Sequence, residues 1–123
     1  MGKIIREIGL IGSNNRQIKL DALFDTGADT NHIAKEFSDG RTIDDIGIFE
    51  FEEEKSIILA DGTPIKGTMI RLKLLKIYGT APIKNPSFCL WDMKLHDVII
   101  GARLMQQLKL KLQPSIKEIS FPI

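Results

Sequence analysis

One acidic residue of this 123-residue chain stands where acids are uncommon, at the end of an apolar run and directly before Thr and Gly. Residues 22–28 read Ala-Leu-Phe-Asp-Thr-Gly-Ala, so that Asp25 is followed by Thr26 and Gly27. A carboxylate in such a place can serve as a general acid or base, because its surroundings decide which protonation state it adopts. Burying an unpaired charge costs on the order of several kcal/mol, so we expect Asp25 to be paired, hydrogen-bonded or protonated.

The residues before Asp25 predict the element that positions it. Apolar residues at 18, 20, 22 and 24 alternate with polar residues at 17, 19 and 21. This period of two is typical of a strand with one buried face. We expect the strand to deliver Asp25 out of the core into a tight turn, where Gly27 adopts backbone angles that other residues resist.

The remaining sequence predicts a single, mainly β domain over residues 1–123. Most apolar runs are short and bounded by turn residues, and the length suits one domain that folds without a metal or disulfide. Asp61-Gly62 predicts a hairpin, residues 13–15 a second bend, and residues 33–37 a short helical turn. A helix is expected over residues 102–108. Expected strands cover residues 3–11, 17–24, 46–51, 56–60, 64–75, 86–91, 96–100 and 116–121.

Composition excludes several classes of function. The net charge is +1, from 17 basic and 16 acidic residues, so no overall field attracts nucleic acid. No apolar run reaches the roughly 18 residues that span a bilayer, and the N-terminus lacks a signal-peptide core. Cys89 is the single cysteine, which fits a reducing compartment, and we expect a cytoplasmic protein with a core thiol at this position.

Two segments together resemble a known family. The Ala-Leu-Phe-Asp-Thr-Gly-Ala-Asp of residues 22–29 is similar to the active-site strand of the retroviral-type aspartic proteases, the retropepsins. The Val-Ile-Ile-Gly of residues 98–101, followed by the expected helix, resembles their second conserved block. The Asp61-Gly62 hairpin falls between them, where that family carries its flap. The resemblance covers residues 17–121 and implies a mainly β, closed-barrel acid protease fold with one short C-terminal helix, present as a homodimer.

The resemblance also implies an aspartic endopeptidase, which hydrolyses peptide bonds with a water activated between two carboxylates. Two carboxylates at short range share one proton, so that one acts as base and the other as acid. The chain contains a single Asp-Thr-Gly, so the second carboxylate must come from another copy. A twofold homodimer would place Asp25 of each copy near its axis. The implied partner is a peptide or protein substrate, and no metal or organic cofactor is implied.

Further residues take roles from the same resemblance. Thr26 and Gly27 would support the active-site loop, with Thr26 hydrogen-bonding across the dyad. The hairpin tip would close over the substrate, and residues 116–121 would supply dimer strands. The implied substrate-binding residues are Gly27, Ala28, Asp29, Ala60, Asp61, Gly62 and Thr63.

The chain departs from the family at two places. The family's helix often begins Gly-Arg, whereas here Ala102 separates Gly101 from Arg103. A shift of one residue turns a helical side chain by about 100°, so the family's loop-buttressing role is not assigned to Arg103. The hairpin tip is less glycine-rich and carries a charge. Ala28 has no hydroxyl that could donate a hydrogen bond to the Asp25 carboxylate and stabilise its ionised form. We therefore expect the wild type to be active nearer neutral pH than the Ala28→Ser variant. Overlapping acidic limbs in the pH–rate profiles of the two proteins would refute this expectation.

Two other interpretations compete with catalysis. A retropepsin-like fold can be a catalytically silent dimerisation or peptide-binding module, because fold alone does not establish activity. An inert module has no need of an intact Asp-Thr-Gly, which favours chemistry. Asp25 can also be a turn residue whose carboxylate is satisfied by backbone N–H groups.

Metal binding has weaker support. Asp25, Asp29, Asn31 and Glu36 occupy four ligand positions of a twelve-residue calcium loop. Position 3 of that loop is a glycine without a side-chain oxygen, position 6 lacks the sharp-turn glycine, and an apolar strand precedes the loop. The two histidines, His32 and His96, have no ligand-like spacing around them, and we expect surface or hydrogen-bonded loop histidines.

Overall fold

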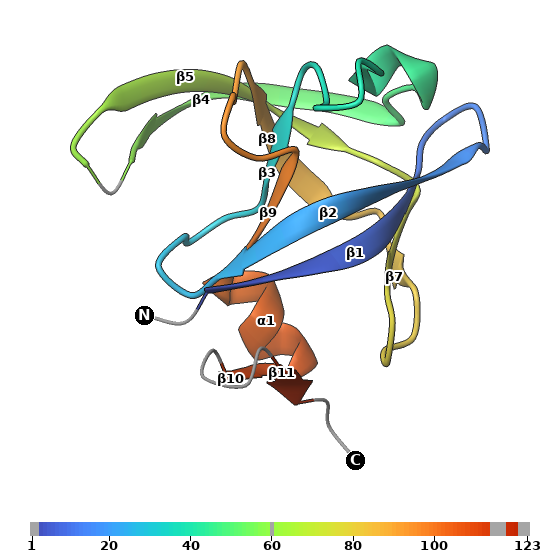
Figure 1. The fold of residues 1–123 in the computed structure, drawn as a ribbon. Helices are drawn as coiled ribbons and strands as arrows, with labels where there is room; N and C mark the ends of the chain where they lie inside the picture. Colours follow the sequence, from blue (N-terminus) through green and yellow to red (C-terminus); the bar gives the residue numbers. More distant parts are fainter. Residues whose placement is uncertain (1–2, 60, 114–117, 121–123) are drawn as a thin grey trace.

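The computed structural model describes residues 3–59, 61–113 and 118–120. Nine strands form one curled sheet in the order β4-β5-β8-β3-β9-β2-β1-β6-β7, and two more form a small separate sheet (Figure 1). The elements in chain order are β1 (Lys3–Ile11), β2 (Gln17–Asp25), β3 (His32–Ala34), a 3-10 turn (Ile43–Asp45), β4 (Glu50–Ile58), β5 (Pro64–Arg71), β6 (Leu74–Ile77), β7 (Ile83–Lys84), β8 (Ser87–Trp91), β9 (Val98–Gly101), α1 (Ala102–Leu108), β10 (Lys111–Gln113) and β11 (Glu118–Ser120).

The β1–β2 hairpin lies inside the large sheet, with β9 beside β2 and β6 beside β1. Its strands pair antiparallel from Ile11↔Gln17 to Lys3↔Asp25, and the bend expected at residues 13–15 connects them. Residues 18, 20, 22 and 24 of β2 are buried and residues 17, 19 and 21 are exposed. The predicted alternation is therefore confirmed, and Asp25 is the last residue of this strand.

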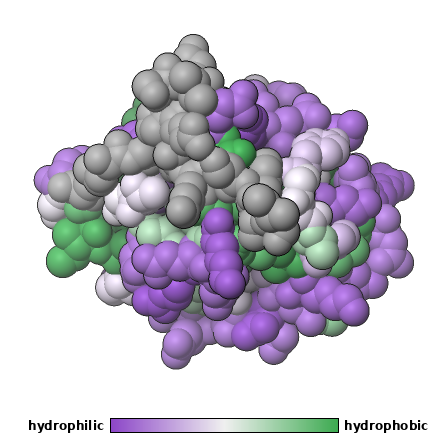
Figure 2. All heavy atoms as spheres, turned by 90° about the horizontal axis from the view of Figure 1, so that it is seen from below, coloured by the Kyte–Doolittle hydropathy of each residue, from purple (hydrophilic) through white to green (hydrophobic). Residues whose placement is uncertain are grey.

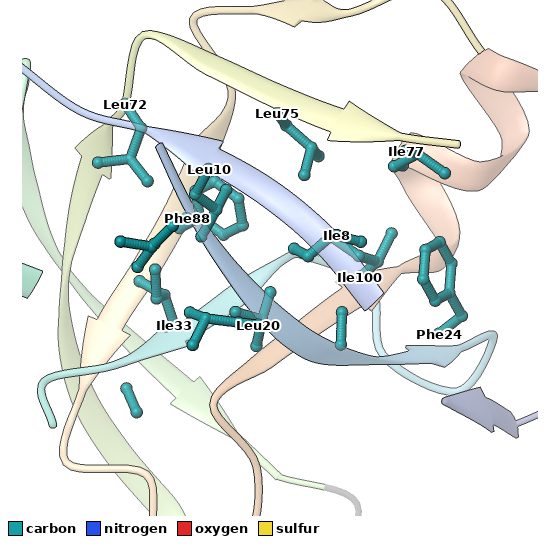
Figure 3. Packing of buried hydrophobic residues seen from close by; sticks show 14 of the residues in the cluster. Ile8, Leu10, Leu20, Phe24, Ile33, Leu72, Leu75, Ile77, Phe88 and Ile100 are labelled. Carbon is teal, nitrogen blue, oxygen red and sulfur yellow. The ribbon is translucent and has the colours of Figure 1, made fainter. Parts of the chain in front are cut away.

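The hydrophobic core lies in the hollow of the curled sheet (Figure 3). Each fully buried aliphatic or aromatic side chain stabilises the fold by about 1.5–3 kcal/mol relative to an exposed one. The contributing strands are distant in sequence, so the core ties both halves of the chain together. Its residues labelled in Figure 3 are Ile8, Leu10, Leu20, Phe24, Ile33, Leu72, Leu75, Ile77, Phe88 and Ile100.

Helix α1 forms where the sequence predicts it and follows β9 directly. Within the helix, Met105 is buried, and Leu104 and Leu108 are partly buried against the core. Lys109 ends the helix in the left-handed region, with φ 56°. The strand before the helix pairs in parallel with β2, so the two segments that carry the family resemblance lie side by side.

The predicted strand pattern is wrong at three places. Residues 46–51 and 56–60 were expected to form two strands, but one strand, β4, runs through Glu50–Ile58. It is an edge strand, so its run of glutamates stays in water. The strand expected over residues 64–75 breaks between β5 and β6, where Leu72 N–H bonds to the carbonyl of Pro86. Residues 33–37 form no helical turn, because β3 lies between β8 and β9 and is buried throughout.

Other predicted elements agree in kind and differ in extent. The strands expected over 86–91 and 96–100 appear as β8 and β9. Only residues 118–120 of the strand expected over 116–121 are described, as β11. The short strands β7 and β10 were not predicted, because two or three residues show no periodicity.

Where the face seen from below is coloured, it is mostly hydrophilic, with smaller apolar areas between the hydrophilic residues (Figure 2). The described helices are too short to traverse a lipid bilayer. Cys89 is buried in β8, as predicted for a core thiol, and burial raises its pKa.

Candidate active site

The carboxylate of Asp25 lies at the point where β2 leaves the sheet. The residue is paired with Lys3 of β1 on one side and Gly101 of β9 on the other. Its side chain is 15% exposed. Oδ1 accepts a 2.8 Å hydrogen bond from the N–H of Gly27, and Oδ2 lies 4.0 Å from Lys3 Nζ. Because the Lys3 side chain is 58% exposed, this ion pair is weak.

The hydrogen bond from Gly27 matches the turn-capping role considered for Asp25, but it occupies only Oδ1. The turn is closed by a second bond, from Ala28 N–H to the Asp25 carbonyl at 3.1 Å. The expectation that Gly27 needs unusual backbone angles is wrong. In the described residues, positive φ values among glycines occur at Gly40, Gly47, Gly62 and Gly79.

The loop after Asp25 is fastened to the start of α1. The N–H of Ala102 donates to the carbonyl of Ala28 at 2.7 Å, and the N–H of Arg103 donates to that of Asp29 at 3.3 Å. A Cβ on Gly101 would lie 2.5 Å from the Thr30 carbonyl oxygen, so only glycine permits this close approach.

Asn31 connects the same loop to two strands. Its Oδ1 accepts the N–H of Gly101 at 2.9 Å, and its Nδ2 donates to the carbonyl of Ser87 at 3.1 Å. The sequence suggested Asn31 only as a calcium ligand. Its partners lie 70 and 56 residues away in the sequence, so no local sequence pattern predicts these hydrogen bonds.

Arg103 forms an ion pair with Asp29, with Nη2 and Oδ2 2.8 Å apart. The side chains are 66% and 75% exposed, so the pair contributes at most about 1 kcal/mol. The one-residue displacement in the sequence therefore does not prevent Arg103 from contacting the loop. Asp29 was predicted to bind substrate, and here its carboxylate is already engaged by this cation.

Asp25 lines a cavity of about 410 Å³ that lies between the loop, β4 and the strands β3, β8 and β9. The loop and the β4–β5 hairpin lie on the same side of the molecule (Figure 1). The cavity brings together four of the predicted site residues, Asp25, Gly27, Ala28 and Asp29. It also includes residues that were not predicted: Thr30, His32, Lys55, Ser56, Ile57, Ile58, Leu59, Trp91 and Ile99.

The predicted hairpin tip is present, but its described residues do not line this cavity; the end of β4 does. The tip is closed by hydrogen bonds between the backbone of Leu59 and that of Gly62 and Thr63. Oδ1 of Asp61 accepts the N–H of Thr63 at 2.8 Å. Hydrogen bonds from Thr63, the side chain's first and the backbone's second, lower the pKa of this exposed carboxyl. Ala60 lies outside the described residues, and Thr26 is exposed beside Asp25.

His32 and Trp91 form a pair in the wall of the cavity. Trp91 Nε1 donates to His32 Nδ1 at 3.0 Å, which places the proton of a neutral imidazole on Nε2, 3.5 Å from Thr30 Oγ1. Burial, and secondarily the charge of Lys55, lower the pKa of His32. The expectation of a surface or loop histidine is wrong at this position, because His32 is a buried strand residue.

The described residues contain no group of three or more His, Cys, Asp or Glu side chains arranged to hold a metal ion. The calcium-loop interpretation is wrong. Residues 32–34 of its twelve are a buried strand, and Asn31 already uses both ends of its amide.

Comparison with known proteins supports the fold but does not establish an activity. No family model and no curated protein matches the chain. Among solved structures, a protein of unknown function (DUF785) from Legionella pneumophila aligns with TM-score 0.56 and 14% identity over 91% of each chain. The retroviral protease-like domain of Ddi1 from Leishmania major aligns with TM-score 0.56 and 13% identity, over 98% of this chain and 89% of that one.

A retropepsin-like aspartic protease from Rickettsia conorii aligns with TM-score 0.53 and 16% identity, over 92% of this chain and 89% of the other. The fold is therefore retropepsin-like: mainly β, with a curled sheet and one short helix. At such identities the likeness establishes the fold alone, because one fold can carry different functions.

Proposed function

We propose that this protein is an aspartic endopeptidase that works as a homodimer, with a water molecule activated between the Asp25 carboxylates of two copies. The observation that carries the proposal is the position of Asp25, a mostly buried carboxylate in the wall of a cavity of about 410 Å³. This volume lies within the range of about 300–1,000 Å³ that is usual for ligand sites.

Among the described residues, one copy of the chain brings a single mostly buried carboxylate to the cavity, that of Asp25. Peptide hydrolysis requires a base to take a proton from water and an acid to protonate the leaving amine. The cavity contains two carboxylates, Asp25 and Asp29, and Arg103 holds the second at 2.8 Å. A twofold partner would provide the missing group as a second Asp25.

The proposed reaction needs no covalent intermediate. An ionised Asp25 accepts a proton from the water as it attacks the carbonyl carbon. The protonated Asp25 of the other copy donates its proton to the nitrogen of the leaving amine. The backbone of an extended substrate can pair with β4 at the sheet edge, because an edge strand offers free N–H and C=O groups.

The same edge strand favours a second candidate, a peptide-binding module that cuts nothing. β4 is the outermost strand on its side of the sheet, and its last residues line the cavity. A peptide can be held there by backbone pairing alone. The intact Asp-Thr-Gly supports the enzyme, since pairing does not require it.

The two candidates separate when wild type and Asp25→Asn are tested on a mixed peptide library, with sedimentation measured alongside. Asp21→Asn is a matched control, since Asp21 is exposed on the same strand and lies outside the cavity. We expect Asp25→Asn to lose at least about 100-fold in cleavage rate while remaining dimeric, and Asp21→Asn to retain full activity. Equal peptide binding and no cleavage by wild type would support the module instead.

A further inference from the structure

A second cavity of about 410 Å³ adjoins the one that holds Asp25. Asp29, Thr30 and Lys55 line both cavities, so they form the partition between them. The second cavity extends away from Asp25, toward the Ile83–Ser87 segment and the outer face of α1. A ligand that fills the first cavity can therefore reach the second across this partition.

The second cavity carries an excess of positive charge. Lys55, Lys84 and Arg103 line it, against a single carboxylate, that of Asp29. Arg103 and Asp29 are paired at 2.8 Å. Within the described part of the chain, Lys55 and Lys84 have no carboxylate within ion-pair distance. Two cations in this cavity thus lack a counter-charge.

One acidic residue lies close to the rim and is already engaged. Glu52 Oε1 accepts hydrogen bonds from Arg71 Nε at 3.1 Å and from the Ser87 hydroxyl at 3.4 Å. Its charge is therefore balanced by Arg71 and does not neutralise the two lysines.

Lys55 is placed to reach into the molecule and not only into solvent. It is paired with Gly67 of β5, which has no side chain to occupy the same face of the sheet. A Cβ at Gly67 would lie 2.3 Å from Cys89 Sγ, so Lys55 lies on the face of the sheet that carries the buried Cys89 side chain. The charge of Lys55 also contributes to the lowered pKa of His32 in the neighbouring cavity.

We propose that the second cavity receives an acidic side chain, Asp or Glu, of the polypeptide whose main chain lies in the Asp25 cavity. This inference rests on the proposed function. Alternate side chains of an extended chain point the same way about 6.5–7 Å apart, so one substrate can occupy both cavities. A carboxylate there would pair with Lys84 and Lys55, a basic side chain would be repelled, and an apolar one would desolvate two ammonium groups.

The cleavage test uses peptides that differ at one position, with Glu, Gln or Lys placed in turn at each residue flanking the cut. At one position we expect wild type to cleave the Glu peptide about fivefold better than the Gln peptide, with the Lys peptide slowest. High salt should shrink the preference. Lys84→Glu should abolish or reverse it, while Lys19→Glu, the same charge change at an exposed residue outside both cavities, should preserve it.

A binding measurement separates failure of this inference from failure of the enzyme. The Glu and Gln peptides are labelled and titrated with Asp25→Asn, and binding is followed by fluorescence anisotropy. Tighter binding of the Glu peptide, lost in Asp25→Asn/Lys84→Glu, supports the acidic site even if wild type cleaves nothing. Equal affinities at every scanned position, or equal effects of Lys84→Glu and Lys19→Glu, would overturn it.

Discussion

The loop after β2 and the β4–β5 hairpin border the same cavity, yet they are held in different ways. β2 is paired on both sides, and its inward residues lie in the core. The loop that follows is bonded to α1, β8 and β9. In contrast, every residue of β4 except Ile57 is exposed, and the strand is paired only with β5.

The difference matches what each region must do in the proposed reaction. A general acid or base works only from a fixed position, so its carboxylate needs a support that resists displacement. A cover over the substrate must open, and segments with few buried contacts open at the lowest free-energy cost. Substitutions of the same kind should therefore have unequal effects in the two regions.

The largest expected contrast is between two phenylalanines. Phe24 on β2 is 0% exposed and Phe51 on β4 is 66% exposed. Phe24→Ala should lower the free energy of unfolding by about 3–5 kcal/mol, because it leaves a cavity in the core. Phe51→Ala should change it by less than about 0.5 kcal/mol. Urea denaturation measures both, and Phe24→Leu is a milder version if Phe24→Ala does not fold. Similar losses at the two positions would remove the distinction between the regions.

Two glycines sharpen the comparison, because each region needs glycine for a different reason. Gly101 has an ordinary φ of −92°, but a Cβ there would lie 2.5 Å from the Thr30 carbonyl oxygen. Gly62 at the hairpin tip has φ +88° and open space around it. Gly101→Ala should cost about 2–3 kcal/mol and displace the Asp25 loop, whereas Gly62→Ala should cost about 1 kcal/mol.

Activity of the folded fraction checks this prediction beside stability. Gly101→Ala should reduce cleavage even where the protein is fully folded, since the clash involves backbone that positions Asp25. Gly62→Ala should leave the cleavage of a saturating substrate nearly unchanged. A Gly101→Ala protein with wild-type stability would show that the loop is free to shift.

Asn31 tests how strongly the loop is bound to the sheet. Asn31→Ala removes the partners of Gly101 N–H and of the Ser87 carbonyl, which should cost about 1–3 kcal/mol. Asn31→Asp keeps an oxygen for Gly101 N–H and should lose less. Thermal unfolding of the three proteins ranks them, and the reverse order would show that the bond to Ser87 dominates.

The parts of the fold that the sequence predicts are those with a local signature. The alternation in β2 and the bend before it predict the β1–β2 hairpin, and the run of helix formers after Gly101 predicts α1. β3 has only three residues and therefore no readable period, and its burial comes from neighbouring strands far along the chain. The glutamates of β4 give no alternation of apolar and polar residues, because a strand at the edge of the sheet leaves them in water.

The candidate site divides in the same way. Asp25, Gly27, Ala28 and Asp29 are contiguous, so one motif reveals all four. The remaining walls are brought together by tertiary structure: Trp91 donates to His32 across 59 residues, and Lys55 faces the cavity through the pairing of β4 with β5. The sequence indicates the hairpin tip as the cover, but the strand leading to it lines the cavity.

His32 provides the prediction of smallest expected size, a pH dependence of stability. Its pKa lies below the ordinary 6.5 in the folded protein, through burial first and Lys55 second. Between that lowered value and about 6.5, the unfolded chain binds a proton that the folded protein does not. The free energy of unfolding should therefore be constant above about pH 7 and fall as pH drops below 6.5, by at most about 1.4 kcal/mol per pH unit.

The physical reason is that protonation of His32 would turn Nδ1 into a donor facing the Trp91 N–H that it now accepts. Urea unfolding between pH 5 and 7 measures the slope, and carboxylates contribute little in that range. His32→Gln should flatten the slope while still offering an oxygen to Trp91, and His96→Gln, which removes the other imidazole, should leave it. An unchanged slope in His32→Gln would mean that the imidazole accepts a proton in the folded protein as readily as in the unfolded chain, and that the bond from Trp91 does not hold it neutral.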